Sequence, residues 1–528
     1  MFSQIASMVL AFQIEFPETP PFDRPDIDWH AAAPELTLLA VGAIVTLLDV
    51  ILLERGRRWS STIAGIGLLA VLVPIITLAM SGVASEPRFV LYGSGGFDGY
   101  VVDGYALVLK AMFVIIGYIV ILLSTKYIAT GDYWESEYYG LLLSSILGMV
   151  VMASARDLVT IFVALELLSI PAYLLAAWRK RDVKSNEAGI KYYLMGVFAS
   201  AIMLYGMSLL FGATGSTELV AIGQAVADQN SPLISLGVVF VIVGFAFKVS
   251  GVPFHSWAPD VYEGAPTPVT AFLAVASKAA GFVALMNLIY VGFWQQADVY
   301  QPMLWILAAA SMTVGNVIAL RQTNIIRLMA YSGIAQAGFM LAPLAIAGTS
   351  AASANESASA VVTYLIIYSA MNLGAFAVVL AVARRTGTGD IASFSGLFQH
   401  SPVLAVLMTG FLASLAGIPP LGGWFAKFQV FKALAGAGTS WGYALAVIAA
   451  VNAVIAFGYY GRLASRMWID DAPAEYGTKP INVPFGLQAA LGITMIATVL
   501  FGVQPGLVTH FTDIELIPDT HPTELADN

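Results

Sequence analysis

The stretch VIVGFAFKVSGVPFH (residues 241–255) decides the fold, because a long apolar run leads directly into a lysine, a glycine and a proline. A charge at the middle of a bilayer costs at least about 2.5–3.5 kcal/mol, so apolar segments rarely keep one that has no role. Gly251 and Pro253 weaken helical hydrogen bonding, which predicts a helix that breaks just after Lys248. Inside a membrane, such a break is tolerated only where protein buries it or where it lines a wet cavity.

A second segment, AGIPPLGGWFAKF (residues 416–428), repeats this pattern of glycine, proline and lysine. The second break lies five predicted spans after the first, and five is odd, so the two halves would have opposite orientation in the membrane. Paired discontinuous helices at corresponding positions of two inverted repeats are typical of transporters. The sequence therefore predicts two inverted five-helix repeats.

The composition places the chain in a membrane. Of its residues 59% are hydrophobic and only 11% are charged, whereas soluble domains average about 25% charged residues. The apolar runs reach the roughly 20 residues that a helix needs to cross the hydrocarbon core, and they lack the alternation of an outer-membrane barrel. We expect an all-α polytopic membrane protein of about fourteen transmembrane helices, near 35–53, 60–81, 102–124, 137–153, 157–178, 189–211, 233–255, 267–293, 302–320, 324–347, 358–383, 402–436, 441–461 and 484–508.

The basic residues predict the orientation. Fifteen Lys and Arg lie in one set of alternate loops and three in the other set. Cytoplasmic loops carry the excess of Lys and Arg, so both termini are expected on the outer, periplasmic side. There is no cysteine and no ligand-spaced histidine cluster, so we expect no iron–sulfur cluster, haem or metal in this chain. The net charge of −9 argues against a nucleic-acid partner.

Four ionisable residues lie inside apolar spans: Glu166, Lys248, Lys278 and Lys427. Loss of water disfavours the charged form of a lysine, so a buried amine can exchange protons near neutral pH. One carboxylate and three amines in one apolar layer predict coupled proton occupancies, that is, a proton relay. The alternative is a static set of ion pairs that fixes helix packing.

Four further residues are weaker candidates. Lys191 follows Glu187 by four residues, so an ordinary helical ion pair competes with an accessory role near Glu166. His255 follows Lys248 by seven residues, and either a proton-carrying role or a satisfied interfacial position fits it. Lys110 and Lys432, near the ends of spans, are expected to extend toward the membrane interface.

At these residues the chain resembles a known family. The segments FKVSGVPFHSWAPDVYEGAPTPVT (247–270), ASKAAG (276–281), NIIRLMAYS (324–332) and AGIPPLGGWFAKF resemble signatures of subunit N of bacterial NADH-quinone oxidoreductase, respiratory complex I. The similarity extends from about 100 to 470. The segments NEAGIKY (186–192) and YGMSLLFGATGST (205–217) fit subunit N better than its paralogues.

The resemblance implies an antiporter-like membrane subunit with a defined division of the chain. An N-terminal extension (1–34) and helices 1–3 (35–128) would precede the first repeat, helices 4–8 (129–293). The second, inverted repeat, helices 9–13 (294–467), would be followed by helix 14 and an acidic tail (468–528).

The resemblance also implies the site and the activity. The proton path of the family matches Glu166, Lys248, Lys278 and Lys427, with Lys191 and His255 as accessory polar residues. Many relatives have a histidine where this chain has Gln336, in YSGIAQ (331–336). Glutamine cannot titrate, so the link between Lys278 and Lys427 would depend on water held by Gln336 and its neighbours.

The expected function is proton translocation across the bacterial inner membrane, driven by redox chemistry elsewhere. As a translocase subunit the chain would carry no cofactor itself, while NADH, FMN, iron–sulfur clusters and quinone would belong to partner subunits. Its partners would be the antiporter-like neighbours and small subunits of the membrane arm, and lipid. The alternatives are a subunit of a multi-subunit cation/proton antiporter, a hydrogenase-type membrane complex, or a purely structural subunit.

Overall fold

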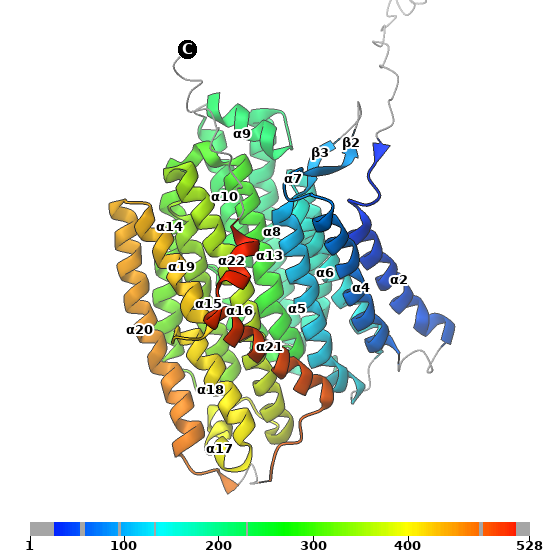
Figure 1. Cartoon of the computed structure of the whole chain (residues 1–528), viewed down its shortest axis with the longest axis vertical. Helices are drawn as coiled ribbons and strands as arrows, with labels where there is room; N and C mark the ends of the chain where they lie inside the picture. The colour runs from blue at the N-terminus through cyan, green and yellow to red at the C-terminus, as the bar shows by residue number, and fades with distance from the viewer. Residues whose placement is uncertain are drawn as a thin grey trace, which may run out of the picture.

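The apolar segments form long helices in the computed structural model, which describes residues 26–52, 59–92, 97–130, 134–228, 231–474 and 479–513. Most of the predicted N-terminal extension and nearly all of the acidic tail lie outside these described residues. Most helices run close to the vertical axis of Figure 1, from α2 and α4 at one edge of the bundle to α20 at the other. The molecule is thus a helical bundle, as the composition predicts.

The long and medium helices follow the predicted spans. Their bounds are α2 (Ala33–Leu52), α4 (Ser60–Met80), α5 (Gly104–Ala129), α6 (Glu135–Ser154), α7 (Leu158–Ala176), α8 (Val183–Thr214), α10 (Pro232–Lys248), α13 (Lys278–Asn287), α14 (Ala297–Ala319), α15 (Ile325–Leu344), α16 (Ala351–Thr386), α18 (Pro402–Ala416), α19 (Gly422–Gly436), α20 (Ser440–Ile469) and α21 (Phe485–Val503).

The shorter elements complete the chain. These helices are α9 (Leu219–Asp228), α11 (Trp257–Gly264), α12 (Thr267–Phe272), α17 (Leu397–His400) and α22 (Gly506–Thr512), with short π or 3-10 turns η1 (Leu273–Ser277), η2 (Leu288–Gly292), η3 (Trp294–Gln296), η4 (Ala347–Thr349) and η5 (Ile391–Phe394). Strands β1 (Asp26–Ile27), β2 (Arg88–Tyr92) and β3 (Phe97–Val102) form an antiparallel sheet in that order. This sheet lies at the same end of the bundle as α9, and α17 lies at the opposite end (Figure 1).

Within the described residues, eleven helical segments are long and apolar enough to cross a membrane, and three shorter apolar helices accompany them. Each of these overlaps a predicted span, and several extend beyond its ends. The number of crossings and the inverted relation of the two repeats stay predictions, because they require the position of the bilayer.

Both predicted helix breaks are present. The first separates α10 from α11 over residues 249–256, where Ser250 has a φ of 60°, and the second separates α18 from α19 over residues 417–421, where Gly417 has a φ of 94°. At the second break the backbone turns back on itself: a Cβ on Gly423 would lie 1.8 Å from the carbonyl oxygen of Ser414. Only glycine fits at this close approach.

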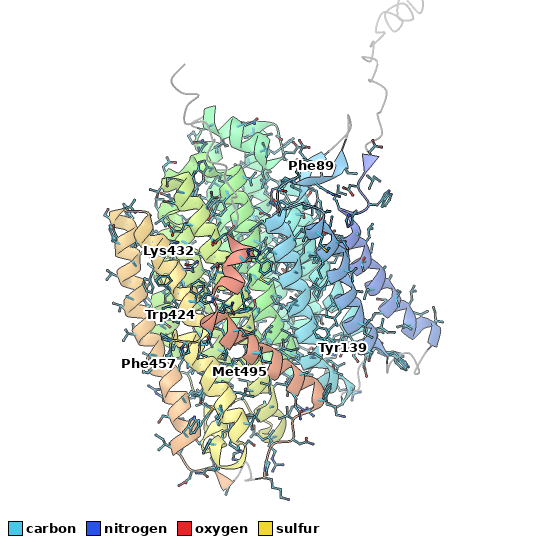
Figure 2. The ribbon with its side chains drawn as sticks, viewed as in Figure 1. Phe89, Tyr139, Trp424, Lys432, Phe457 and Met495 are labelled. Atoms are coloured by element: carbon cyan, nitrogen blue, oxygen red, sulfur yellow. The ribbon has the colours of Figure 1, made fainter. Side chains whose placement is uncertain are left out.

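Large apolar side chains cover the outside of the bundle. Phe457 is 55% exposed on α20, and Figure 2 shows it at the outer edge of the molecule. Lys432 is also exposed and pairs with Glu356, Nζ to Oε1, at 2.9 Å. Exposed apolar residues on a bundle this hydrophobic indicate a lipid-facing surface, and Lys432 reaches out of the core as expected.

Candidate functional site: a line of buried amines

The first part of the site joins helices α7, α8 and α10. Glu166 is half-buried on α7, and its Oε1 accepts a hydrogen bond from Ser200 of α8 at 2.6 Å. Ser169, three residues further along α7, accepts a hydrogen bond from the Lys248 ammonium at 2.7 Å. Residues three apart share a helix face, so Glu166 lies on the same side of α7 as Ser169, where the Lys248 amine of α10 is bound. The Lys248 nitrogen also lies 3.4 Å from the Tyr192 hydroxyl.

The second part centres on Lys278, which begins α13 directly after the π-helical turn η1. Such π segments inside α-helices frequently mark functional sites. The Lys278 amine donates a 2.7 Å hydrogen bond to the carbonyl oxygen of Gly333 on α15. The aliphatic stem of Lys248 packs beside Gly281, because a Cβ there would lie 3.1 Å from Cγ of Lys248. Gly281 is three residues after Lys278, so Lys248 reaches the helix face that carries the next amine.

The third part links Gln336 to Lys427. Gln336 lies three residues after Gly333 on α15, and its Nε2 donates to the carbonyl oxygen of Leu415 at 3.2 Å. Lys427 donates to the same carbonyl at 3.0 Å and to that of Ala416 at 2.8 Å. Both acceptors are the last carbonyls of α18 before the break, which has freed them from helical partners. The broken helix thus supplies the oxygen atoms that hold Lys427.

None of the three lysines forms an ion pair with any residue that the structure describes. Their exposed fractions are 4% for Lys248, 2% for Lys278 and 5% for Lys427, and the partners are hydroxyl and carbonyl oxygens. A carbonyl oxygen accepts a hydrogen bond from either an ammonium or a neutral amine. These partners therefore do not fix the lysines in the charged form, as carboxylates would.

Lys191 lies in a separate ion cluster. Its Nζ contacts Glu187 at 2.7 Å and Asp260 at 2.9 Å, so the predicted helical ion pair is present. Arg327 of α15 reaches Asp260 at 2.8 Å and Glu263 at 3.1 Å. Burial would raise the pKa of Asp260, but hydrogen bonds from Lys191 and Arg327 outweigh burial and hold that pKa below its ordinary value. The cluster joins α8, α11 and α15.

His255 lies half-buried in the first helix break, and its Nδ1 has no hydrogen-bond partner among the described residues. No hydrogen bond or ion pair in that part of the chain connects it to Lys248. The structure thus places Glu166 on the side of α7 that carries Ser169, the partner of Lys248. It joins Gln336 to Lys427 through the Leu415 carbonyl, and it leaves Lys191 and His255 outside this line.

Buried tyrosines are the residues that sequence reasoning missed. Tyr364 donates a short hydrogen bond to Oε1 of Gln336, and the Tyr460 hydroxyl lies 3.3 Å from Nε2 of Gln336. A Cβ on Gly333 would lie 3.1 Å from the Tyr368 hydroxyl and 3.3 Å from the Lys278 nitrogen. Aromatic residues in a membrane protein are expected at interfaces. The hydroxyl group of tyrosine, which can donate and accept a hydrogen bond, is the one sequence signal that could have indicated a place beside the line of amines.

The expectation for Lys110 is wrong. Its side chain has no exposed surface and does not extend to the interface; its Nζ lies 2.6 Å from Oε1 of Glu35 on α2. The Tyr100 hydroxyl donates to the same carboxylate oxygen at 2.7 Å. Lys110 lies two turns inside α5, too deep to reach water, so a partner from the first helix supplies the compensating charge.

The fold and site define a class: a polytopic membrane protein with two broken helices and a line of buried amines. The family model described as "NADH:quinone oxidoreductase/Mrp antiporter, TM" matches residues 155–453. A protein of Koribacter versatilis named NADH-quinone oxidoreductase subunit N 1 is 37% identical over 90% of this chain and 93% of its own length. The chain belongs to this family, among its NADH-quinone oxidoreductase subunit N members.

Solved structures agree with the fold. A chain of respiratory complex I from Thermus thermophilus is 30% identical, with a TM-score of 0.73 over 90% of this chain and 98% of that chain. A chain of the Mrp complex from Dietzia sp. DQ12-45-1b is 19% identical, with a TM-score of 0.80 over 94% of this chain and 99% of that chain. The second likeness shows the shared fold alone.

Proposed function

We propose that this chain is the proton-translocating subunit of an NADH-quinone oxidoreductase in the bacterial inner membrane. The observation that carries the proposal is the set of three buried lysines whose partners are hydroxyl and carbonyl oxygens. A structural ion-pair role would need carboxylates beside them. The subunit N relatives, at 35–40% identity, favour this function over a cation/proton antiporter or a hydrogenase-type complex.

The proton would move from Glu166 to Lys248, then to Lys278, and through the Gln336 region to Lys427. A charge change near Glu166 would alter the proton affinity of Lys248, because the Lys248 amine binds Ser169 on the side of α7 that carries Glu166. Moving one charge across 100 mV is worth about 2.3 kcal/mol, so the affinity of a relay lysine must change by more than tenfold between states. Waters held by tyrosine hydroxyls and Gln336 would complete the path, since glutamine does not titrate.

The remaining assignments follow from this function. The chain would carry no redox centre, and NADH, FMN, iron–sulfur and quinone chemistry would lie in partner subunits. Its neighbours would be the other membrane-arm subunits. Helices of the two predicted repeats would be inverted relative to each other, and both termini would face the periplasm. Lys191 would act at the edge of the path, within its ion cluster, and His255 would serve as an accessory group at the first break.

Replacement of the first and last lysines tests the proposal. Lys248→Ala or Lys427→Ala, in the assembled complex in vesicles, should reduce NADH-driven proton uptake to less than about a tenth of the unaltered value, since each removes the only amine at its step. Lys180→Ala, at an exposed loop position, is the control. Normal proton uptake with normal assembly would contradict the relay.

A further inference from the structure

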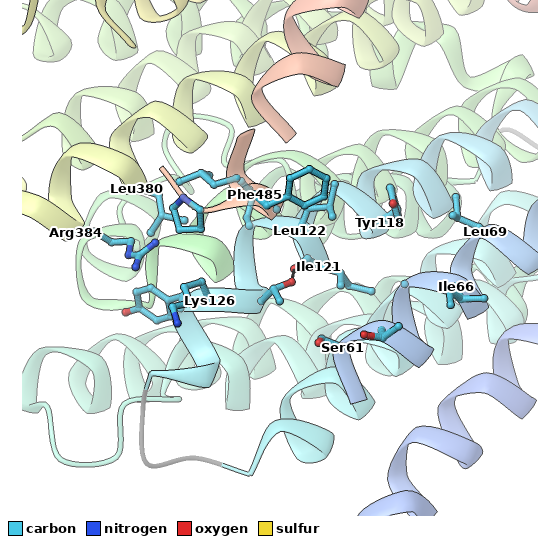
Figure 3. Close-up of a pocket in the computed structure, with 18 residues that line it drawn as sticks. Ser61, Ile66, Leu69, Tyr118, Ile121, Leu122, Lys126, Leu380, Arg384 and Phe485 are labelled. Carbon is cyan, nitrogen blue, oxygen red and sulfur yellow. Dashed lines mark hydrogen bonds between the residues drawn. The ribbon is translucent and has the colours of Figure 1, made fainter. Parts of the chain in front are cut away.

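A groove of about 440 Å³ opens between helices α4, α5, α16 and α21, away from the line of amines. Figure 3 shows its residues: Lys126 and Arg384 lie together at one end, and Leu69 lies at the other. Most of the wall is apolar, with Ile66 and Phe485 among its residues. The groove therefore has a cationic end and an apolar remainder.

The cationic end lacks a protein anion. Lys126 and Arg384 are both exposed, and neither forms an ion pair with another residue in the described part of the chain. The lining contains no Asp or Glu. The start of α21, at Phe485, lies at the same place and has no side-chain cap, so its first amides and the helix dipole also favour negative charge. Lys126, Arg384 and the start of α21 thus all favour an anion at this end of the groove.

The length of the groove along α5 matches the hydrocarbon thickness of one bilayer leaflet. On α5 the lining extends from Tyr118 to Tyr127, which is about 14 Å at 1.5 Å per residue. Half of the hydrocarbon core is about 15 Å. Further outward, a second groove of about 430 Å³ follows the same helices, from Leu107 to Ile119 on α5, with an almost wholly apolar lining. The seam between these helices is therefore apolar beyond its cationic end.

The geometry points to a bound anionic phospholipid, with its phosphate between Lys126, Arg384 and the first turn of α21, and an acyl chain along Gly65 and Tyr118. Basic pockets between transmembrane helices on the cytoplasmic side bind anionic headgroups in this manner. Both cations belong to the loops predicted to be cytoplasmic. A lipid here would fill the seam that joins the first helices of the chain to α16 and α21. The inference is independent of proton transfer.

Photo-crosslinking of lipid tests this site directly. The assembled complex, in vesicles of phosphatidylcholine, receives a trace of phosphatidylglycerol or phosphatidylcholine that carries a diazirine in one acyl chain, and peptide mass spectrometry maps the labelled residues. We expect the phosphatidylglycerol probe to label residues 118–127 of α5 at least about tenfold more than the phosphatidylcholine probe, since each basic residue near the surface favours an anionic lipid. This comparison needs no variant.

Matched variants separate charge from shape. Lys126→Gln with Arg384→Gln should weaken phosphatidylglycerol labelling about thirtyfold, whereas Lys180→Gln with Arg181→Gln removes the same charge elsewhere and should change nothing. Gly65→Leu, whose Cβ would contact Tyr118 at 3.6 Å, should reduce labelling by both probes. Gly492→Leu, which meets no atom within 4 Å, should not. Equal labelling by the two probes in the unaltered complex, or a partner helix seated in the groove of that complex, would overturn the inference.

Discussion

At the scale of single residues, the site depends on which groups compensate buried charge. Lys110 has a carboxylate partner at 2.6 Å, whereas Lys278 has a carbonyl oxygen at 2.7 Å. The first arrangement pairs opposite charges, whereas the second supplies an acceptor that serves an ammonium and a neutral amine equally. Two buried lysines in one chain therefore have different chemistry, and the difference comes from their partners.

Gln336 allows a prediction about the middle of the path. Gln336→Leu would leave the Tyr364 hydroxyl without its acceptor, at about 1–3 kcal/mol for an unsatisfied group. It would also remove one of the two donors to the Leu415 carbonyl, and it should reduce proton uptake severalfold. Gln336→His restores a polar, titratable group and should keep most of the uptake. The two variants are compared in vesicles at equal complex content. Equal uptake by both would show that this position does not take part.

Lys110 and Glu35 allow a double-mutant test of stability. Glu35→Leu leaves a buried ammonium unpaired and should destabilise the protein by about 3–5 kcal/mol, whereas Glu35→Leu combined with Lys110→Met should recover most of that loss. Thermal unfolding of the purified complex in detergent measures the difference. Additive effects of the two substitutions would mean that the pair does not act as a unit.

The sequence predicts the charged residues of the site better than the neutral ones. Lys248, Lys278 and Lys427 are conspicuous in apolar runs, because a buried charge has a high cost. Tyr364, Tyr368 and other hydroxyl donors resemble ordinary apolar packing residues in sequence, so only the fold shows that they surround the path. The Glu35 partner of Lys110 is 75 residues away along the chain, and no local pattern indicates it.

At the scale of elements, glycine and proline predict the two helix breaks, and the structure confirms both. The π-helical turn before Lys278 has no such signal, because its residues, Leu273–Ser277, include no glycine or proline. All residues of this turn are buried, and a local sequence pattern does not contain the tertiary contacts of a buried segment. Helix breaks that contain glycine and proline are therefore predictable from the sequence, whereas this π-helical turn, which contains neither, is not.

Gly423 tests the second break. Gly423→Ala would place a methyl group 1.8 Å from the Ser414 carbonyl oxygen, so the backbone at the break must move, at a cost of about 1–3 kcal/mol. We expect lower thermal stability and lower proton uptake together, since the next two carbonyls of α18, those of Leu415 and Ala416, hold Lys427. Gly492→Ala, on open surface of α21, is the control. Unchanged stability in Gly423→Ala would mean that the break adapts freely.

At the scale of the whole molecule, an ion cluster joins three helices at the edge of the path. Because hydrogen bonds lower the pKa of Asp260, its contribution to stability is present above the ordinary value of about 3.9 and is lost as pH falls through the lowered value. In Arg327→Gln that pKa returns upward toward its ordinary value, so the variant should be less stable near neutral pH and should lose less stability as the pH falls. Thermal unfolding across acidic pH measures the shift, and identical curves would contradict it.

If protons pass through the buried amines, the loss of Lys278, the middle lysine of the line, should be felt first in proton transfer. Lys278→Met keeps the length of the side chain and removes its titration. The measurement is the number of protons taken up per NADH oxidised, in vesicles that contain the assembled complex. We expect this ratio to fall in Lys278→Met and to stay normal in Lys180→Met. An unchanged ratio in a fully assembled Lys278→Met complex would contradict it.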